Sequence, residues 1–581
     1  MGVGLAESIR VWRLVLRHAV SRLGLRLRAA LSSPFSSFRT TATGLLIAPE
    51  DIRTADPTVA SDIYAGLFVF SGQIVEVNGH GPFGVIPPDE DWARALHGFS
   101  WLRHLRAADT ALARSNARAL VEDWMRVQRH LPPVAFRPEV VARRVLSFLS
   151  HAPLILDAAD PDFTQRFLKC LSGQVKLLSA TALLTPDGLP RLQAALALLA
   201  ASISLEGLSP RARMTAQTMV DREIARQILP DGGHVSRSPE AILDILIDLL
   251  PIRQALAVRN VPPSPTMMNA VDRMMPMLRF FRHGDGAFAC FNGTGNPAAG
   301  ILATVLAFDD TGGSTLRSAS HSGYQRLEAG GTLVLVETGP PPPSELSTRA
   351  HAGCLSFEFS SRRQRIVVNC GAPPPGRPEW RSVARRTAAH STVVIEGTSS
   401  ADILGPGWAE HQIGPVIIAG PQTVPVERPD SLDGDQMMTA RHDGYAARFG
   451  LVHERMIAVD ASGSRVDGRD RFLPAGSGPK TGADGFTLRF HLHPQVRAST
   501  VRSGTAAILV TGDGESWTFT APGHEITLEE SVHLASAQGL RRTLQIAITG
   551  AATLVPEVAW SFVRDPASRG RRRPPMDLLK G

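Results

Sequence analysis

Apolar residues recur every three or four positions through much of the chain between about residues 90 and 285. This is the spacing of one face of an α-helix. The clearest segment, 240–256, follows Ser238 and Pro239, a favoured cap and a favoured first helical residue. Segment 192–205 is apolar on nearly every side, which predicts a deeply buried helix. The pattern indicates an all-α domain in this half of the chain.

Beyond about residue 315 apolar and polar residues begin to alternate. Segments 355–360 and 488–493 alternate strictly, as half-buried antiparallel strands do. The break between the two patterns falls between residues 295 and 322. Many short strands separated by Gly and Pro predict a β-sandwich; the further candidates are 365–369, 392–396, 508–511, 517–520 and 544–549.

One polar stripe interrupts the apolar helix pattern. Glu240, Asp244 and Asp248 stand four positions apart in segment 240–256, so they share one side of the predicted helix. We interpret the stripe as a solvated face and not as a metal site.

Composition and charge narrow the class of protein. A chain of 581 residues with 43% hydrophobic and 20% charged residues is predicted to form at least two globular domains. The net charge of +7 favours an anionic partner, such as an acidic polysaccharide, anionic lipid or nucleic acid. Only three tyrosines occur, and no run pairs basic with aromatic residues, so nucleic acid is the least favoured of the three.

The N-terminal stretch 10–26 interleaves apolar residues with arginines. It lacks the uninterrupted apolar core of a secretory signal. No part of the chain reaches about 20 uncharged apolar residues, so no membrane-spanning helix is predicted. Two interpretations stay open: a helix that makes peripheral contact with anionic lipid, and a helix or frayed end packed on the protein itself.

The four cysteines, Cys170, Cys290, Cys354 and Cys370, contain no C-x-x-C pair. We expect buried thiols. A Cys354–Cys370 bridge between neighbouring strands is the alternative if the protein is exported.

Three groups of residues are candidates for chemistry. The first is the loop 231–239, in which His234 and Arg237 precede a helix start. The unpaired N–H groups at a helix start favour a bound carboxylate. The alternative is that both side chains only close the loop.

The second group is His351, Asn369 and His390, each at the end of a predicted strand. Two imidazoles and a side-chain oxygen on adjacent strands suit one zinc ion, although a carboxamide is a weaker ligand than a carboxylate. Histidines satisfied by ordinary hydrogen bonds are the alternative. In the third group, Arg489, His491 and His493 share one strand face. We expect that face to line an anion-binding cleft or to be solvated, because all three cannot be core residues.

The following segments together resemble the heparinase II/III family: DGGHVSRSP (231–239), SGYQRLEAGGTLVLVETG (322–339), HAGCLSFEFSS (351–361), RIVVNCG (365–371), RRTAAHSTVVIEG (385–397), HDGY (442–445) and RFHLHP (489–494). The resemblance implies an α+β multidomain protein, with an incomplete α/α toroid followed by an antiparallel β-sandwich. It also implies these divisions: a basic lead-in (1–89), the toroid (90–310), the sandwich (315–565) and a basic tail (566–581).

The family cleaves uronate-containing polysaccharides by β-elimination, which requires a carboxylate neutraliser, a base and an acid. The resemblance places His234 at the neutraliser or base position. We expect Tyr324 and Arg349 to complete the catalytic group, and Arg237, Tyr445, Arg489 and His493 to bind substrate. The resemblance places His351, Asn369 and His390 at a structural metal site. It also implies an acidic polysaccharide partner and a cell-envelope or periplasmic location; without a convincing signal, a cytoplasmic location is the alternative.

This chain departs from the family pattern at three positions. Ala241 stands where the family has a tyrosine, Arg349 where it has an assisting histidine, and Asn369 where it has a metal-binding aspartate. Two hypotheses follow. In the first, the protein is a lyase in which Tyr324 or Tyr445, with a pKa lowered beside Arg326 or a histidine, replaces the missing tyrosine. In the second, it is a non-catalytic glycan-binding or envelope-assembly protein.

Overall fold

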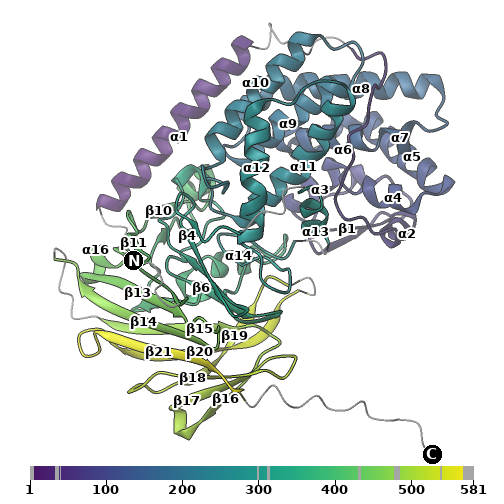
Figure 1. The fold of residues 1–581 in the computed structure, drawn as a ribbon. Coiled ribbons are helices and arrows are strands. Elements are labelled where there is room, and N and C mark those ends of the chain that lie inside the picture. Colours follow the sequence, from purple (N-terminus) through teal and green to yellow (C-terminus); the bar gives the residue numbers. More distant parts are fainter. Residues whose placement is uncertain are drawn as a thin grey trace, which may run out of the picture.

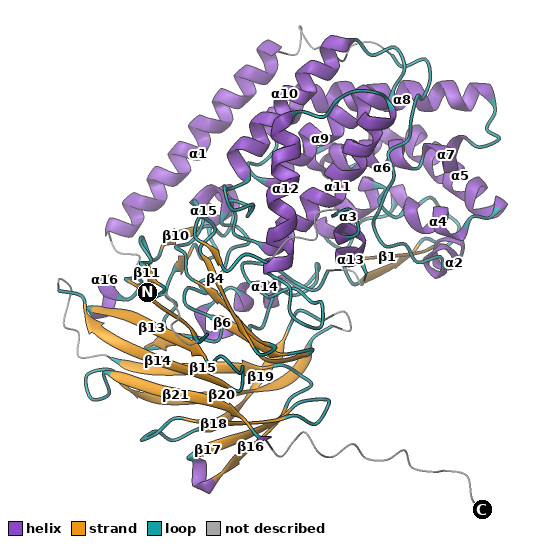
Figure 2. Cartoon of the chain, in the orientation of Figure 1, coloured by secondary structure: helices purple, strands orange, loops and turns teal. Residues whose placement is uncertain are grey.

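The computed structural model describes residues 5–32, 38, 41–297, 300–309, 315–429, 434–476, 484–536 and 539–566. Within them a helical half precedes a strand-rich half, and the two halves lie against each other (Figures 1 and 2). The predicted order of the α domain and the antiparallel sandwich is confirmed. The predicted basic tail lies, except for residue 566, outside the described residues.

The helical half is built from amphipathic helices whose apolar faces meet in one core. Helix α9, the segment predicted to be apolar on nearly every side, is buried along almost its whole length. The helices are α1 (Leu5–Ser32), α2 (Thr58–Tyr64), α3 (Glu90–Gly98), α4 (Leu102–Ala108), α5 (Ala111–Val127), α6 (Pro138–Ser150), α7 (Ala152–Leu156), α8 (Pro161–Thr181), α9 (Leu189–Ser204), α10 (Pro210–Gln227), α11 (Pro239–Val258), α12 (Pro265–Phe280) and α13 (Ile301–Leu306).

A hairpin in the lead-in was not predicted. Strands β1 (Leu67–Phe70) and β2 (Gln73–Glu76) pair antiparallel around a turn at Ser71 and Gly72. Each strand has four residues, which is too short for alternation to separate a strand from a loop.

The strand-rich half holds two large antiparallel sheets and three short helices, α14 (Pro378–Ala384), α15 (Trp408–Ile413) and α16 (Ala446–Phe449). One sheet has the order β11-β12-β13-β14-β21-β18-β17-β16. The other has the order β19-β20-β15-β7-β6-β5-β4-β3, with β8 also paired to β15. The strands are β3 (Ser318–Ala319), β4 (Tyr324–Ala329), β5 (Thr332–Glu337), β6 (Phe357–Ser361), β7 (Gln364–Val368), β8 (Val393–Ile395), β9 (Asp402–Ile403), β10 (Ile417–Ala419), β11 (Val426–Glu427), β12 (Gln436–His442), β13 (Leu451–Val459), β14 (Arg465–Pro474), β15 (Gly485–Leu492), β16 (Arg497–Val501), β17 (Ala506–Val510), β18 (Ser516–Thr520), β19 (Thr527–His533), β20 (Arg541–Ala551) and β21 (Glu557–Arg564).

Aromatic rings from both sheets fill the space between them. Phe357 on one sheet stacks on Trp560 of the other, with ring centroids 5.4 Å apart. Phe490 meets the same tryptophan edge-on at 5.0 Å. Offset and edge-on contacts of this kind add to the apolar burial that holds a sandwich together.

The prediction that Arg489, His491 and His493 form an open or solvated face is wrong for the two histidines. His491 and His493 are 3% and 7% exposed. His491 contacts the Ser531 hydroxyl and the Ala388 carbonyl oxygen. Strand alternation correctly separated this face from the apolar one, but it did not reveal that Ser531 of β19 and the loop before β8 cover the histidine face as well.

A buried carboxylate joins the two halves. Glu358 on β6 is wholly buried and accepts hydrogen bonds from the backbone N–H groups of Cys290 (3.0 Å) and Asn369 (2.9 Å). Its second oxygen lies 2.9 Å from Nε2 of His283, which follows helix α12. One side chain therefore ties the end of the helical half to two strands of the sandwich.

The predicted thiols are free. The structure records Cys170, Cys290, Cys354 and Cys370 as unbridged, the last three buried. One stretch, Pro161–Leu184, has a length and apolar composition that would allow it to cross a membrane. Its residues Phe163, Phe167 and Leu171 are packed in the helical core, as expected for a core helix.

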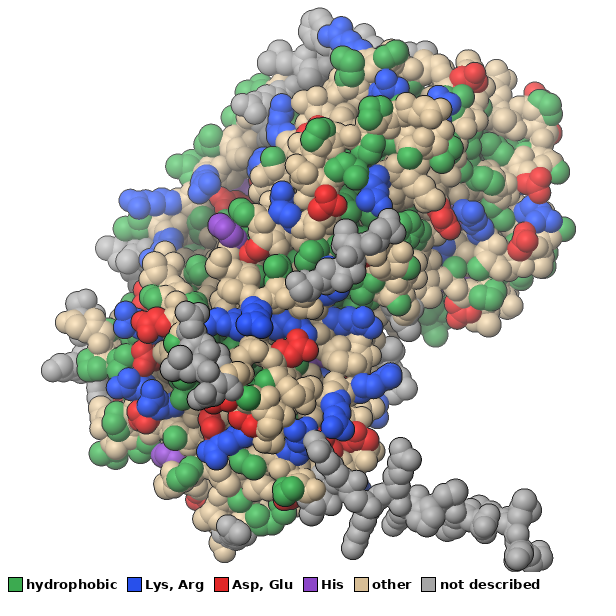
Figure 3. All heavy atoms as spheres, viewed as in Figure 1, with side chains coloured by type: hydrophobic (Ala, Val, Ile, Leu, Met, Phe, Trp, Pro, Cys, Tyr) green, Lys and Arg blue, Asp and Glu red, His purple; other side chains and the backbone are tan. Residues whose placement is uncertain are grey.

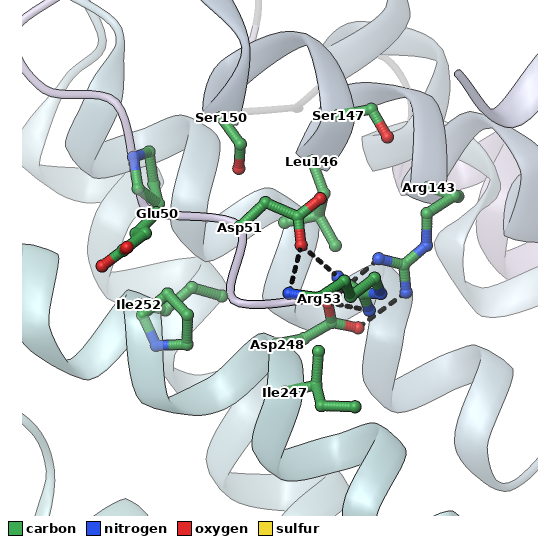
Figure 4. A pocket seen from close by; sticks show the side chains of 12 residues that line it. Glu50, Asp51, Arg53, Arg143, Leu146, Ser147, Ser150, Ile247, Asp248 and Ile252 are labelled. Atoms are coloured by element: carbon green, nitrogen blue, oxygen red, sulfur yellow. Dashed lines mark hydrogen bonds and ion pairs between the residues drawn. The ribbon is translucent and has the colours of Figure 1, made fainter. Parts of the chain in front are cut away.

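The acidic stripe on α11 does not form the predicted solvated face. Asp248 is 5% exposed and forms ion pairs with Arg53 and Arg143, each at 2.7 Å. Figure 4 shows both guanidinium groups pointing at this carboxylate, with Asp51 beside Arg53. Burial opposes ionisation, but the two arginines hold the pKa of Asp248 well below its usual range. The lead-in is therefore clamped onto α6 and α11 through one buried charge.

Removing that charge is expected to destabilise the helical half. Breaking a buried pair leaves uncompensated charges, so Asp248→Ala should lower the free energy of unfolding by about 3–5 kcal/mol. The control Glu122→Ala removes the exposed pair with Arg166 and should cost less than about 1 kcal/mol. Urea denaturation followed by far-ultraviolet circular dichroism measures both. Equal midpoints for the two variants would contradict the clamp.

Candidate functional site

The loop before α11 is docked onto the strand-rich half. Asp231 accepts hydrogen bonds from the backbone N–H and the hydroxyl of Ser322, both at 2.7 Å. A Cβ atom at Gly233 would lie 1.8 Å from the Ser322 hydroxyl oxygen, so only glycine permits this approach. The loop carrying His234 and Arg237 therefore faces the start of β4.

The start of α11 is capped differently from the prediction. Ser238 occupies the cap position but makes no side-chain cap hydrogen bond. The Thr294 hydroxyl instead accepts from the Glu240 N–H at 3.3 Å. The predicted anion site at this helix start is thus occupied by a side chain of the same protein.

Both nitrogens of His234 are engaged. Its Nδ1 accepts from the Ser236 N–H at 3.1 Å, and its Nε2 lies 3.0 Å from the Gln227 side-chain oxygen. The Ser236 hydroxyl oxygen lies 2.6 Å from Nδ1. The ring is 2% exposed, and burial lowers the pKa of His234 to about 4. In this geometry His234 is a neutral loop-closing residue, which is the alternative weighed for it from sequence.

Tyr324 lies where the helical and strand-rich halves meet, a region that we call the joint, and it contacts both halves. Its hydroxyl donates to the backbone carbonyl of Arg237 at 2.7 Å and accepts from the Asn292 amide at 2.8 Å. Burial, and then the nearby Glu337 carboxylate, raise the pKa of Tyr324 well above its ordinary value. Arg326 turns away to the Phe280 carbonyl at 2.8 Å. The expectation of a phenol with a lowered pKa is wrong for Tyr324.

The side chain of Asn292 links Tyr324 to a second buried acid. The Asn292 amide donates to Glu337 at 2.7 Å, while its oxygen accepts from the His351 N–H at 3.1 Å. Burial raises the pKa of Glu337 to about 7, although Asn292 and Arg237 partly offset it. The second carboxyl oxygen of Glu337 and one terminal nitrogen of Arg237 are buried without a hydrogen-bond partner among the described residues. Sequence reasoning missed Asn292 and Glu337, since one lies in a Gly-rich break and the other ends an apolar strand.

Arg237 and Arg349 occupy opposite sides of the same joint. Arg237 has a left-handed φ of 61°, and its guanidinium lies against Gly323 and Gly339, where added Cβ atoms would be 2.6 and 1.6 Å from one nitrogen. Arg349 is 65% exposed and lies 3.5 Å from Glu240. The structure thus brings Arg237, Tyr324 and Arg349 to one interface.

The candidate metal ligands are adjacent but already bonded to one another. His351 Nδ1 lies 3.0 Å from His390 Nε2, and the Asn369 oxygen accepts from the Ser391 N–H at 3.0 Å. Burial and His390 lower the pKa of His351, and burial lowers the pKa of His390 to about 4. No group of three His, Cys, Asp or Glu side chains within the described residues is placed to hold a metal. His351 and His390 therefore lie close enough to share an ion or a hydrogen-bond network, as expected, and the neutral imidazole is the form that binds zinc. The Asn369 oxygen is used by Ser391, and the zinc site implied by the resemblance stays a prediction.

The remaining candidates lie within the sandwich. The Tyr445 hydroxyl donates to the Val393 carbonyl at 2.8 Å, and burial raises the pKa of Tyr445. Burial likewise lowers the pKa of Arg489, which is half-buried. His493 packs its ring against that of His533, with centroids 5.5 Å apart. Tyr445 and His493 are buried, and Arg489 is the one of these three that is partly exposed.

Comparison with known proteins places this architecture. The family model described as "Heparinase II/III-like, C-terminal" matches residues 311–561. A crystal structure of heparinase III matches with a TM-score of 0.66 at 13% identity, covering 90% of this chain and 87% of that one. Heparan sulfate lyase HepC from Pedobacter heparinus matches with a TM-score of 0.56 at 15% identity, covering 94% and 88%. These matches confirm the predicted incomplete toroid followed by a β-sandwich.

A relative also matches most of the chain, including most of the region that the family model covers. FtsZ-localized protein C from Caulobacter vibrioides (strain NA1000 / CB15N) is 30% identical over 516 residues, which cover 87% of this chain and 86% of that protein. The chain belongs to the heparinase II/III-like family.

The low pKa of His234 predicts a pH-dependent stability. The unfolded pKa of 6.5 exceeds the folded value of about 4, so the unfolded state binds more protons between these values and stability falls as pH drops from 6.5 to 4. At pH 5 the loss is about 2 kcal/mol from this residue. His234→Gln, which retains a donor and an acceptor, should flatten the decline in Tm between pH 7 and 5. His321→Gln, at an exposed histidine, should leave the wild-type slope unchanged. A wild-type slope in His234→Gln would mean that the ring is protonated in the fold.

Proposed function

We propose that this protein is a non-catalytic member of its family, which lies on a membrane surface and takes part in assembly at the cell-division site. The loss of catalysis is inferred from the burial and hydrogen bonding of two tyrosine hydroxyls. Tyr324 and Tyr445 are each 1% exposed, and each donates its proton to a backbone carbonyl. Position 241, where the family tyrosine would stand, is a buried alanine.

The chemistry of β-elimination explains why this matters. The base that removes the C5 proton has to reach the substrate, and the acid has to be able to release its proton near neutral pH. A buried phenol with a raised pKa does neither. His234 is bonded at both nitrogens, and the guanidinium of Arg349 has donors but no acceptor atom that could take up a proton. The contacts of these groups are those of residues that hold the two halves together, and not those of a catalytic acid and base.

Helix α1 supports the membrane part of the proposal. Six large apolar residues, spaced three or four apart, are 46–65% exposed along it: Ile9, Trp12, Leu16, Val20, Leu23 and Leu27. This spacing forms one continuous stripe on a helix of 28 residues. Arg13, Arg22 and Arg26 are exposed on the same helix. An apolar stripe flanked by arginines is the pattern of a helix that lies in the headgroup region of an anionic bilayer.

The helix is also held to the body of the protein. Trp12 contacts Trp408 of α15, with ring centroids 4.8 Å apart. Arg10 donates to the Ile418 carbonyl at 3.2 Å, and Arg17 lies 3.2 Å from Glu345. Figure 1 shows α1 along one flank of the molecule, beside both halves. Of the two interpretations drawn from sequence, packing on the protein is observed for the inner face, and lipid contact is proposed for the outer stripe.

The relative named for its localisation with FtsZ supports the cellular role. Because the similarity covers almost the whole of both chains, we extend that localisation to this protein. The proposed place is the cytoplasmic side of the membrane, in preference to the periplasmic location implied by the family resemblance. An acidic glycan remains the partner expected if the protein is instead a lyase.

A turnover assay tests the loss of catalysis. A panel of uronate-containing polysaccharides, incubated with and without chelator, should give no near-ultraviolet absorbance from an unsaturated uronate. A heparinase III run in parallel is the positive control. If absorbance develops and disappears in Tyr324→Phe while remaining in the control Tyr64→Phe, the lyase hypothesis replaces this proposal.

Vesicle co-sedimentation tests the membrane contact. Wild type should bind vesicles containing anionic phosphatidylglycerol and release them as salt is raised, because burial of the stripe and charge attraction both contribute. Leu16→Glu with Val20→Glu and Leu23→Glu should reduce binding at least tenfold. The control places glutamate at three apolar residues that are 57–90% exposed elsewhere, Ile74, Ile86 and Leu112, and should bind within twofold of wild type. Equal loss in both variants would point to net charge alone.

A further inference from the structure

A second charged surface lies where the two halves meet. Figure 3 shows basic side chains gathered along the border between the helical and the strand-rich half. Arg282, after α12, and Arg362 and Arg363, in the turn between β6 and β7, are exposed at this border. We call these three residues the border arginines.

The border arginines stand on tightly packed turns. The turn at His283–Gly286 approaches the β6–β7 turn so closely that a Cβ atom on Gly284 would lie 1.7 Å from the Arg362 carbonyl oxygen. His283 is fixed by the Ser360 hydroxyl and by Glu358, each at 2.9 Å. The Arg362 N–H donates to the Gly331 carbonyl of a third turn at 2.6 Å. The three guanidinium groups therefore extend from a rigid base.

Arg362 occupies a backbone conformation that disfavours it. The β6–β7 connection has two residues, since Ser361 pairs with Gln364. Such turns favour Gly or Asn where φ is positive, yet Arg362 has a φ of 49°. A charged side chain at a strained position is a reason to look for a ligand.

The acidic side chains beside the border arginines have other partners. Asp285 accepts from Arg365 and from the Ala287 N–H, both at 2.9 Å. Glu328 accepts from the Arg326 Nε at 2.9 Å. Within the part of the chain that the structure describes, none of the three border arginines forms an ion pair. This leaves a local excess of three positive charges on one surface.

The composition of this surface favours a polypeptide over a glycan, because ligand pockets of that kind are lined mainly by apolar and aromatic side chains. The aromatic side chains among the exposed large hydrophobics of the described residues, Trp12 and Trp408, are located at α1 and α15. Exposed guanidinium groups are suited to carboxylates of a flexible chain, which they hold by paired charge-assisted hydrogen bonds.

We propose that the border arginines form a docking surface for an acidic, unstructured segment of a partner protein. The contact is separate from α1, so it predicts binding in the absence of lipid and goes beyond the proposed membrane role. Arg362 is the central residue, because it contacts the β4–β5 turn as well as the turn after α12.

The test measures binding of the full chain to a fluorescently labelled 16-residue peptide of alternating Glu and Gly. Binding is measured by fluorescence anisotropy at low salt, without vesicles. Replacing the three border arginines by Glu should weaken binding at least tenfold. The control Arg129→Glu, Arg222→Glu and Arg497→Glu changes the net charge equally at exposed arginines on separate elements, and should weaken binding less than twofold. Equal loss in the two variants would overturn the proposal.

Two further measurements separate the remaining outcomes. Arg362→Gly relieves the left-handed strain, so it should raise Tm while weakening peptide binding at least threefold; an unchanged affinity would overturn the role of Arg362. If a heparin hexasaccharide binds more tightly than the peptide, and its binding is lost in the same triple variant, the border arginines bind a glycan instead. Neither result depends on turnover or on vesicle binding, so failure here leaves the proposed function standing.

Discussion

The fold depends on one buried negative charge that has to be matched from two directions. Glu358 lies on the face of β6 that meets the helical half, and an unpaired carboxylate buried there would cost several kcal/mol. His283 and the Cys290 N–H reach it from the end of the helical half, and the Asn369 N–H reaches it from the next strand. Because these donors come from separate segments, the two halves have to meet in one register for the charge to be satisfied. The contacts at Tyr324, Asn292 and Glu337 then follow from that register.

Periodicity predicted the larger features because burial on one face is a local property of the chain. The helix at 240–256, the buried helix at 192–205 and the strand at 488–493 were all read from it, and each is present. The motif resemblance also identified the residues that meet at the joint. His234, Tyr324 and His351 lie within one chain of contacts through Arg237 and Asn292.

Periodicity did not predict what lies on the second face of an element. Asp248 was assigned to solvent because its helix has a polar stripe, yet the lead-in brings Arg53 to it from almost 200 positions away in sequence. His491 was assigned to an open face, yet β19 supplies Ser531 to cover it. The direction of the pKa shift of Tyr324 could not be predicted from the sequence either, because it is set by burial and by the Glu337 carboxylate on the neighbouring strand.

The attachment of α1 limits how the protein can sit on a surface. The helix contacts α8 and the turn Ala182–Leu184 on the helical side, and α15 and β10 on the sandwich side. Because α1 is fixed to both halves, a bilayer that binds its outer apolar stripe would also fix the orientation of the whole protein. The long axis of α1 would lie in the plane of the membrane. Every other surface of the protein would then stay at a constant distance from the bilayer and in a constant orientation to it. The helix would then determine which surface of the protein faces away from the membrane.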